Sequence, residues 1–142
     1  MKRAYVDTNV ILRFLTGTPP HQAEEAKRLF EAAERGEVTL ILDEIVLAEV
    51  VWVLSSFYKF NKSTIRDVLQ SFVMNPGIDM QDKVGALLAL TLFADLNIDF
   101  EDALVSVHMN RDHVREIFTF DKHFDRLPGI NRLTPGRMTR DA

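Results

Sequence analysis

The stretch VTLILDEIVLAEVVWVL, residues 38–54, decides the fold. Its first part, Val38–Leu42, is a continuous run of β-branched residues and leucine, which is typical of a strand buried in a parallel sheet. Asp43 then stands at the position of a helix N-cap, and the chain from Glu44 to about Tyr58 is apolar nearly all round. A buried strand that leads directly into a buried helix predicts an α/β domain.

The same alternation continues on both sides of this stretch. Strands are expected at residues 3–6 and 116–120, with a weak one near 131–133. Amphipathic helices are expected at 21–35, 63–74, 83–96 and 100–110, and a short helical turn at 122–126. Strands that alternate with helices favour a three-layer α/β/α arrangement with a short, mainly parallel central sheet.

Length and composition limit the function. The 142 residues suit one domain, 1–142, with no linker that would divide it. The absence of cysteine excludes a disulfide scaffold, a zinc–thiolate site and a catalytic thiol, and it fits a cytoplasmic protein. No run approaches the ~20 apolar residues that cross a bilayer, so no membrane association is expected.

A net charge of −4 opposes nucleic-acid binding through phosphate contacts alone, unless several acids gather around a metal ion. The acids that end strands are the first candidates. Asp7 follows the first predicted strand and Asp121 follows the strand near residue 120, whereas Asp43 is explained as a helix cap. Because ligands bind outside the carboxyl ends of parallel strands, Asp7 and Asp121 are expected to face one crevice of one sheet.

Two further acids lie in helices. Glu49 is the only charge between Ile45 and Phe57. A carboxylate there should lose hydration and need a metal or a neighbouring cation, unless it lies at an edge where it reaches water. Asp102 is placed in the first turn of its helix, where the helix dipole favours an anion.

Four carboxylates in one crevice would repel one another without a cation. A hard cation with oxygen ligands, Mg²⁺ or Mn²⁺, would relieve that repulsion and could activate water to cut a nucleic-acid backbone. The predicted metal ligands are Asp7, Glu49, Asp102 and Asp121.

Four blocks of sequence resemble the PIN domain, and within it the VapC-type ribonuclease toxins of prokaryotic toxin–antitoxin systems. The blocks are VDTNV at 6–10, AEV at 48–50, FEDAL at 100–104 and TFDK at 119–122, followed by HFDRLPG at 123–129. Their order and rough spacing agree along nearly the whole chain.

The resemblance implies a metal-dependent endoribonuclease that leaves a 3′-hydroxyl and a 5′-phosphate. It implies a homodimer, an RNA substrate and a VapB-type antitoxin whose tail occupies the active-site groove. By position, Asp7, Glu49, Asp102 and Asp121 form the acidic set. Asn9 would hold that set by hydrogen bonds and Thr119 would orient the Asp121 end.

One position departs from the pattern: many relatives carry an acid two residues after the position of Asp121, and here it is His123. His123 could contact metal-bound water or phosphate, or the position could be dispensable. Without the four clustered acids the net charge is near zero, so that local cations could grip phosphate. The candidates are Arg13, Lys59, Lys122, Arg126, Arg132, Arg137 and Arg140.

Two alternatives remain open from the sequence. One is a PIN-like domain that only binds protein or RNA, although all four acids are present. The other is a phosphoacceptor receiver domain, which also places acids at strand ends and uses Mg²⁺ but leaves Glu49 unexplained. A stable adduct with acetyl phosphate would favour the receiver domain.

Overall fold

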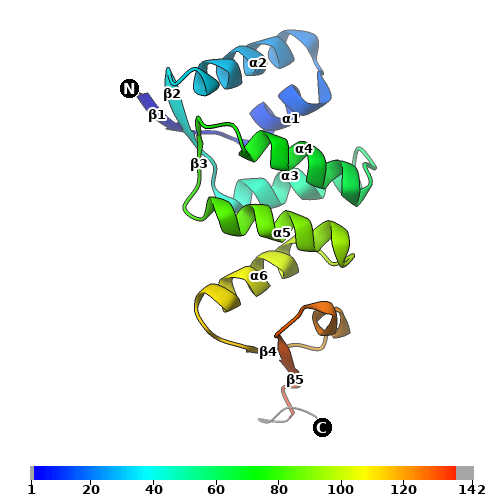
Figure 1. Ribbon diagram of the computed structural model, residues 1–142. Coiled ribbons are helices and arrows are strands. Elements are labelled where there is room, and N and C mark those ends of the chain that lie inside the picture. Colours follow the sequence, from blue (N-terminus) through cyan, green and yellow to red (C-terminus); the bar gives the residue numbers. More distant parts are fainter. Residues whose placement is uncertain (1, 137–142) are drawn as a thin grey trace.

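The chain is described from a computed structural model over residues 2–136. Six helices and a three-stranded parallel sheet form an α/β structure, which confirms the predicted class (Figure 1). The strands are β1 (Lys2–Tyr5), β2 (Val38–Ile41), β3 (Ile78–Asp79), β4 (Glu116–Phe118) and β5 (Asn131–Leu133). The helices are α1 (Thr8–Thr16), α2 (Pro20–Glu34), α3 (Glu44–Ser56), α4 (Lys62–Val73), α5 (Lys83–Asp95) and α6 (Phe100–Arg111), with a 3₁₀ helix η1 (Lys122–Arg126).

The main sheet has the strand order β1-β2-β3, with every neighbour parallel. Lys2 lies opposite Val38 and Tyr5 opposite Ile41, and the pairing extends by a hydrogen bond from the Val6 amide to the Ile41 carbonyl. The carboxyl ends of β1 and β2 therefore lie side by side, immediately before α1 and α3. This confirms the short parallel sheet.

The expectation that β4 belongs to the same sheet is wrong. β4 pairs in parallel with β5 in a separate two-stranded sheet, where Glu116 lies opposite Asn131. In Figure 1, β4 and β5 lie at the opposite end of the molecule from β1, beyond α5 and α6. The pattern of apolar residues predicts that a segment forms a strand, but it does not tell with which other strand that segment pairs. The sequence therefore did not reveal this arrangement.

Two elements were not predicted. Residues 8–16 form helix α1, which begins at the N-cap Asp7 and ends at Gly17, a residue in the left-handed conformation (φ 73°). The strand β3 is only two residues long, too short to give a recognisable pattern. The other helices and strands lie within a few residues of their predicted bounds.

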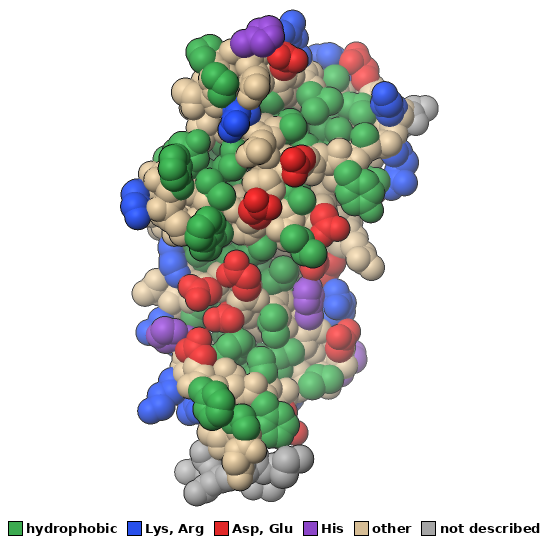
Figure 2. Space-filling model, turned by 180° about the vertical axis from the view of Figure 1, so that it is seen from behind, with side chains coloured by type: hydrophobic (Ala, Val, Ile, Leu, Met, Phe, Trp, Pro, Cys, Tyr) green, Lys and Arg blue, Asp and Glu red, His purple; other side chains and the backbone are tan. Residues whose placement is uncertain are grey.

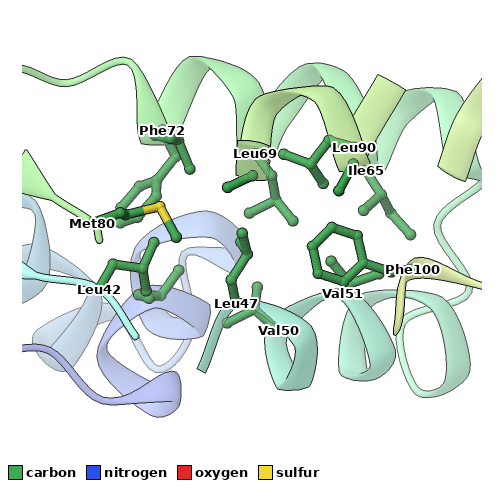
Figure 3. Close-up of a cluster of buried hydrophobic side chains, with 14 of the residues drawn as sticks. Leu42, Leu47, Val50, Val51, Ile65, Leu69, Phe72, Met80, Leu90 and Phe100 are labelled. Atoms are coloured by element: carbon green, nitrogen blue, oxygen red, sulfur yellow. The ribbon is translucent and has the colours of Figure 1, made fainter. Parts of the chain in front are cut away.

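The core forms where α3, α4, α5 and the start of α6 meet (Figure 3). Leu47 and Val50 of α3 face Leu69 of α4, while Phe100 at the start of α6 packs beside Val51. All of these side chains are buried. Since Phe100 anchors the first turn of α6 in this core, Asp102 is held at a fixed place near it. No helix within residues 2–136 has the length and apolarity to span a membrane.

Candidate metal centre

Asp7 follows β1 and begins α1. Its Oδ1 accepts a hydrogen bond from the Thr8 amide at 2.8 Å, and its side chain is exposed. The N-terminal end of α1 carries unpaired backbone N–H groups, so a carboxylate is stabilised there without being neutralised. Asp7 therefore presents its side chain to solvent beyond the carboxyl end of β1.

Thr8 joins Asp7 to Glu49. Its hydroxyl donates to Glu49 Oε2 at 3.0 Å, and the side chain of Thr8 is buried, with 4% exposed. This bond links α1 to α3. It attaches Glu49 to the residue that directly follows Asp7 in the chain. The sequence analysis missed Thr8; the available signal was a polar residue at the start of an apolar run, directly after an acid.

Glu49 lies on an exposed stripe of α3, not on a buried face. Ile45, four residues before it, is 76% exposed and Trp52, three residues after it, is 62% exposed. The expectation that Glu49 loses its hydration is wrong, and the alternative of an edge position that reaches water holds. The physical reason is that α3 is apolar nearly all round, while its neighbours cover only the side that bears Leu47 and Val50.

Asp102 is half-buried in the first turn of α6. Burial raises the pKa of its carboxyl above the ordinary value, and the charges of Asp99, Asp121 and Glu101 raise that pKa further, while His123 opposes them. Asp102 and Asp121 are therefore close enough to feel each other's charge. The two acids come from different elements, the start of α6 and the end of the β4 segment.

Asp121 is oriented by its neighbours in the chain. Its amide donates to Thr119 Oγ1 at 2.9 Å, and its Oδ1 accepts from the His123 amide at 2.9 Å. The His123 ring also lies against it, with 3.2 Å between Nδ1 and Oδ1. The Thr119 hydroxyl thus binds the backbone of Asp121, and His123 makes a direct contact with the carboxylate itself.

Asn9 lies in the first turn of α1, two residues after Asp7. It is exposed on α1 and lines a groove of about 420 Å³ together with Arg13 and Gln22. Within residues 2–136 no hydrogen bond joins Asn9 to any of the four carboxylates. Its expected role in holding the acidic set is therefore not seen in this conformation.

The structure thus presents the acidic set as two halves: Asp7 with Glu49, and Asp102 with Asp121. Between Lys2 and Gly136, no three histidine or acidic side chains stand close enough to hold one metal ion. Acidic side chains gather over the middle of one face, with hydrophobic ones among them (Figure 2). The donor atoms of both halves are carboxylate oxygens, which suit a hard divalent cation.

The predicted phosphate-binding cations are partly engaged elsewhere. Arg126 donates to the carbonyl of Asn97 at 2.7 Å, and Arg132 makes two hydrogen bonds to Asp125. Lys59 and Lys122 are exposed. Arg137 and Arg140 lie outside the described residues.

Comparison with known proteins relates the chain to a family and to a curated protein. Residues 4–130 match the family model of the PIN domain. A VapC ribonuclease from Aquifex aeolicus (strain VF5) is 26% identical over 131 residues, which cover 92% of this chain and 95% of that protein. The chain is thus similar to that ribonuclease along nearly all of both lengths.

Proposed function

Because this chain belongs to the PIN domain family, we propose that it is a metal-dependent endoribonuclease of the VapC type. It hydrolyses RNA phosphodiester bonds with a divalent cation, Mg²⁺ or Mn²⁺, held by Asp7, Glu49, Asp102 and Asp121. Its products are a 3′-hydroxyl and a 5′-phosphate. The observation that carries the proposal is the Thr8 hydroxyl, which ties Glu49 of α3 to the Asp7 end of β1.

That hydrogen bond brings together two acids that are 42 positions apart in the sequence. The Thr8 amide donates to one oxygen of Asp7, and the Thr8 hydroxyl donates to one oxygen of Glu49. The remaining carboxylate oxygens of Asp7 and Glu49 are free to bind a cation. A structural role alone would not require two exposed acids on one buried threonine. The geometry therefore supports a ligand site at this place.

The residues of the two halves have distinct tasks. Asp7 and Glu49 contribute ligands from the main sheet and α3, while Asp102 and Asp121 contribute ligands from α6 and the β4 segment. Thr8 positions Glu49, and Thr119 with His123 positions Asp121. When bound, the cation supplies an activated water and stabilises the charge that develops on the phosphate.

The assignment extends to partners. A VapC-type enzyme implies a homodimer and a VapB-type antitoxin, and its substrate is RNA. The exposed apolar side chains on α3, Ile45 and Trp52, provide surface for a protein partner. The antitoxin would be encoded beside this protein as a small DNA-binding protein.

The test is cleavage of a structured RNA in Mg²⁺ or Mn²⁺, with and without EDTA. Wild-type protein should cleave only with the metal, and Asp7→Asn and Asp102→Asn should abolish cleavage because each removes a charged ligand. Asp43→Asn is the matched control: this Asp also follows a strand but caps α3, with its Oδ1 accepting from the Ile45 amide. Since Asn caps helices as well as Asp, this variant should keep full activity.

Equal cleavage by wild type and Asp102→Asn would overturn the metal-ligand assignment. Binding of RNA by wild type without any metal-dependent cleavage would overturn the nuclease proposal and favour the binding-module alternative. Analysis of the product ends then checks the chemistry: a 5′-phosphate is expected, and a 2′,3′-cyclic phosphate would contradict it.

A further inference from the structure

A cavity of about 440 Å³ lies between the last two long helices and the C-terminal segment, residues 116–133, which forms β4, η1 and β5. Its walls come from α5, from α6, from the chain that joins α6 to β4, and from the loop that follows η1. In Figure 1, β4, β5 and η1 lie beyond α6, at the opposite end of the molecule from β1. The cavity therefore lies at the joint between two parts of the fold.

Most of the cavity wall is apolar. Val107 of α6 and Leu127 after η1 form its deeper part, with 7% and 3% of their surface exposed. Leu88 of α5 and Val114 lie at its rim, and they are 46% and 52% exposed. A cavity of this size, with apolar walls and a few polar groups, is typical of a site for a small molecule. An apolar ligand body would remove this exposed surface from water.

Three exposed polar side chains border the cavity: Asn110, His113 and Arg115. Within residues 2–136 these side chains take part in no hydrogen bond or ion pair. Among the described residues that line the cavity, none is an Asp or a Glu, although the whole chain has a net charge of −4. The lining therefore offers a guanidinium group and further hydrogen-bond donors without a competing carboxylate, and this combination suits an anion.

The end of α6 places His113 at the cavity. The Val114 amide donates to the Met109 carbonyl at 2.9 Å, and the His113 amide donates to the Asn110 carbonyl at 3.2 Å. These two bonds close the helix in a Schellman motif, which needs a left-handed residue at the position of His113. The φ of His113 is 59°.

Glycine is the usual residue at that position of the motif, because a side chain disfavours the left-handed conformation. Backbone conformations of this kind are found most often at functional sites, where the strained residue has a use. The imidazole of His113 borders the cavity. A role of that imidazole in binding explains why a histidine stands where a glycine would be more stable.

We propose that this cavity is a further binding site, which takes a small anion with an apolar body, such as an aromatic or aliphatic carboxylate or sulfonate. Arg115 binds the anionic group, while His113 and Asn110 donate further hydrogen bonds to it. The apolar body packs against Val107 and Leu127. The bound molecule thus contacts α6 and the loop after η1 together, and it holds the C-terminal segment against the helices. The site is separate from the candidate metal centre, so its test needs neither metal nor RNA.

The probe for the test is 8-anilinonaphthalene-1-sulfonate, which carries a sulfonate on an apolar aromatic body and fluoresces when that body leaves water. A fluorescence titration of the wild-type protein should saturate. Arg115→Gln should weaken the affinity about tenfold or more, because it removes a charge-assisted hydrogen bond. The matched control is Arg111→Gln, since Arg111 is also exposed at the end of α6 but pairs with Asp112 and does not line the cavity. This control should bind the probe as wild type does.

An uncharged probe separates recognition of the anion from apolar adsorption. N-phenyl-1-naphthylamine has the same body without the sulfonate, so wild type and Arg115→Gln should bind it equally. Adsorption of the sulfonate probe to exposed apolar side chains elsewhere, such as Ile45 and Trp52, would not depend on Arg115. The proposal is overturned if Arg115→Gln leaves the affinity for the sulfonate unchanged, or if it weakens the binding of both probes alike.

His113→Gly separates binding from stability. Glycine adopts the left-handed conformation without strain, so the melting temperature should stay the same or rise. The affinity for the sulfonate probe should fall about threefold or more, because a hydrogen-bond donor is lost. An unchanged affinity would contradict the proposed contact between the imidazole and the anion.

Hydrogen exchange then locates the bound probe. Amides in residues 127–130, where the Ile130 amide donates to the Leu127 carbonyl, should exchange more slowly with the sulfonate probe bound. Amides of α3 should exchange at an unchanged rate. If residues 127–130 show no protection, or if the protection is confined to α3, the site does not lie in this cavity and the proposal fails.

Discussion

At the scale of single residues, a buried hydroxyl decides how Glu49 is presented. The Thr8 hydroxyl donates to Glu49 at 3.0 Å from a position that is almost fully buried. A hydrogen bond from a neutral donor to a carboxylate inside a protein is stronger than one in water, and it limits the rotamers of the carboxylate. Thr8 is therefore a positioning residue.

Replacement of Thr8 tests this role. Thr8→Val keeps the shape but removes the donor, and a hydrogen bond to a charged group is worth about 1.5–3 kcal/mol. The rate of RNA cleavage, as kcat/KM, should fall about tenfold to a hundredfold. Thr8→Ser keeps the hydroxyl and should cleave near the wild-type rate; an equally impaired serine variant would show that the hydroxyl is not the cause.

Asp102 allows a prediction on pH. Burial and the neighbouring acids raise the pKa of its carboxyl, so the folded protein holds this proton more tightly than the unfolded chain does. The charge of Asp102 therefore lowers the free energy of unfolding. This loss of stability is absent below the pKa of the unfolded chain, about 3.9, and it grows as the pH rises through the raised pKa of the folded protein. Below about pH 3.9 both states are protonated and the cost vanishes.

Asp102→Asn removes that cost. In EDTA the variant should melt at a higher temperature than wild type at pH 7, and the difference should shrink as the pH falls toward 4. Thermal melts at a series of pH values measure it. If the difference in melting temperature between Asp102→Asn and wild type stays constant over this pH range, the charge of Asp102 is not the cause of that difference.

At the scale of elements, caps and close contacts fix where helices begin. Asp7, Asp43, Asn61 and Asp82 each accept a hydrogen bond from a backbone amide in the first turn of their helix. The candidate ligand Asp7 is therefore also a structural cap. This double role explains why the sequence alone could not separate a turn-former from a ligand at this position.

The approach of β3 to α2 depends on Gly77. A side chain there would collide with the backbone carbonyl of Ala33 near the end of α2, and Gly77 also lies next to the β2–β3 pairing through its carbonyl bond to the Leu40 amide. Gly77→Ala should lower the free energy of unfolding by about 1–3 kcal/mol, because crowding a packed site forces the backbone to shift. Urea denaturation measures it.

The matched control is Gly136→Ala, since nothing lies within 4 Å of a Cβ built there. Its unfolding free energy should stay close to the wild-type value. A Gly77→Ala variant as stable as wild type would show that α2 and β3 are not held at the distance seen here.

At the scale of the whole molecule, metal binding should stabilise the fold. If the four acids bind a cation in the folded protein and not in the unfolded chain, the metal raises the free energy of unfolding. A ligand at ~100 times its Kd adds about 2.7 kcal/mol of stability. For a domain of this size that corresponds to a rise of about 5 °C or more in melting temperature.

Melting curves with and without millimolar Mn²⁺ test this coupling. The wild-type melting temperature should rise with Mn²⁺, and Asp121→Asn should lose most of that rise. Asp125→Asn, which changes an exposed acid paired with Arg132, should respond to Mn²⁺ as wild type does. A wild-type curve that does not move with Mn²⁺ would contradict the metal centre.

The sequence by itself determined the class of the fold, the short parallel sheet and most helix bounds, because hydrophobic periodicity, caps and breakers act locally along the chain. It also singled out the acids, since chemistry is carried by residue type and by position at strand and helix ends. Only the tertiary structure decided that Thr8 joins Asp7 to Glu49, that Glu49 is exposed, and that β4 leaves the main sheet. Those outcomes depend on which surfaces meet, and contacts between distant segments leave no periodic signal in the sequence.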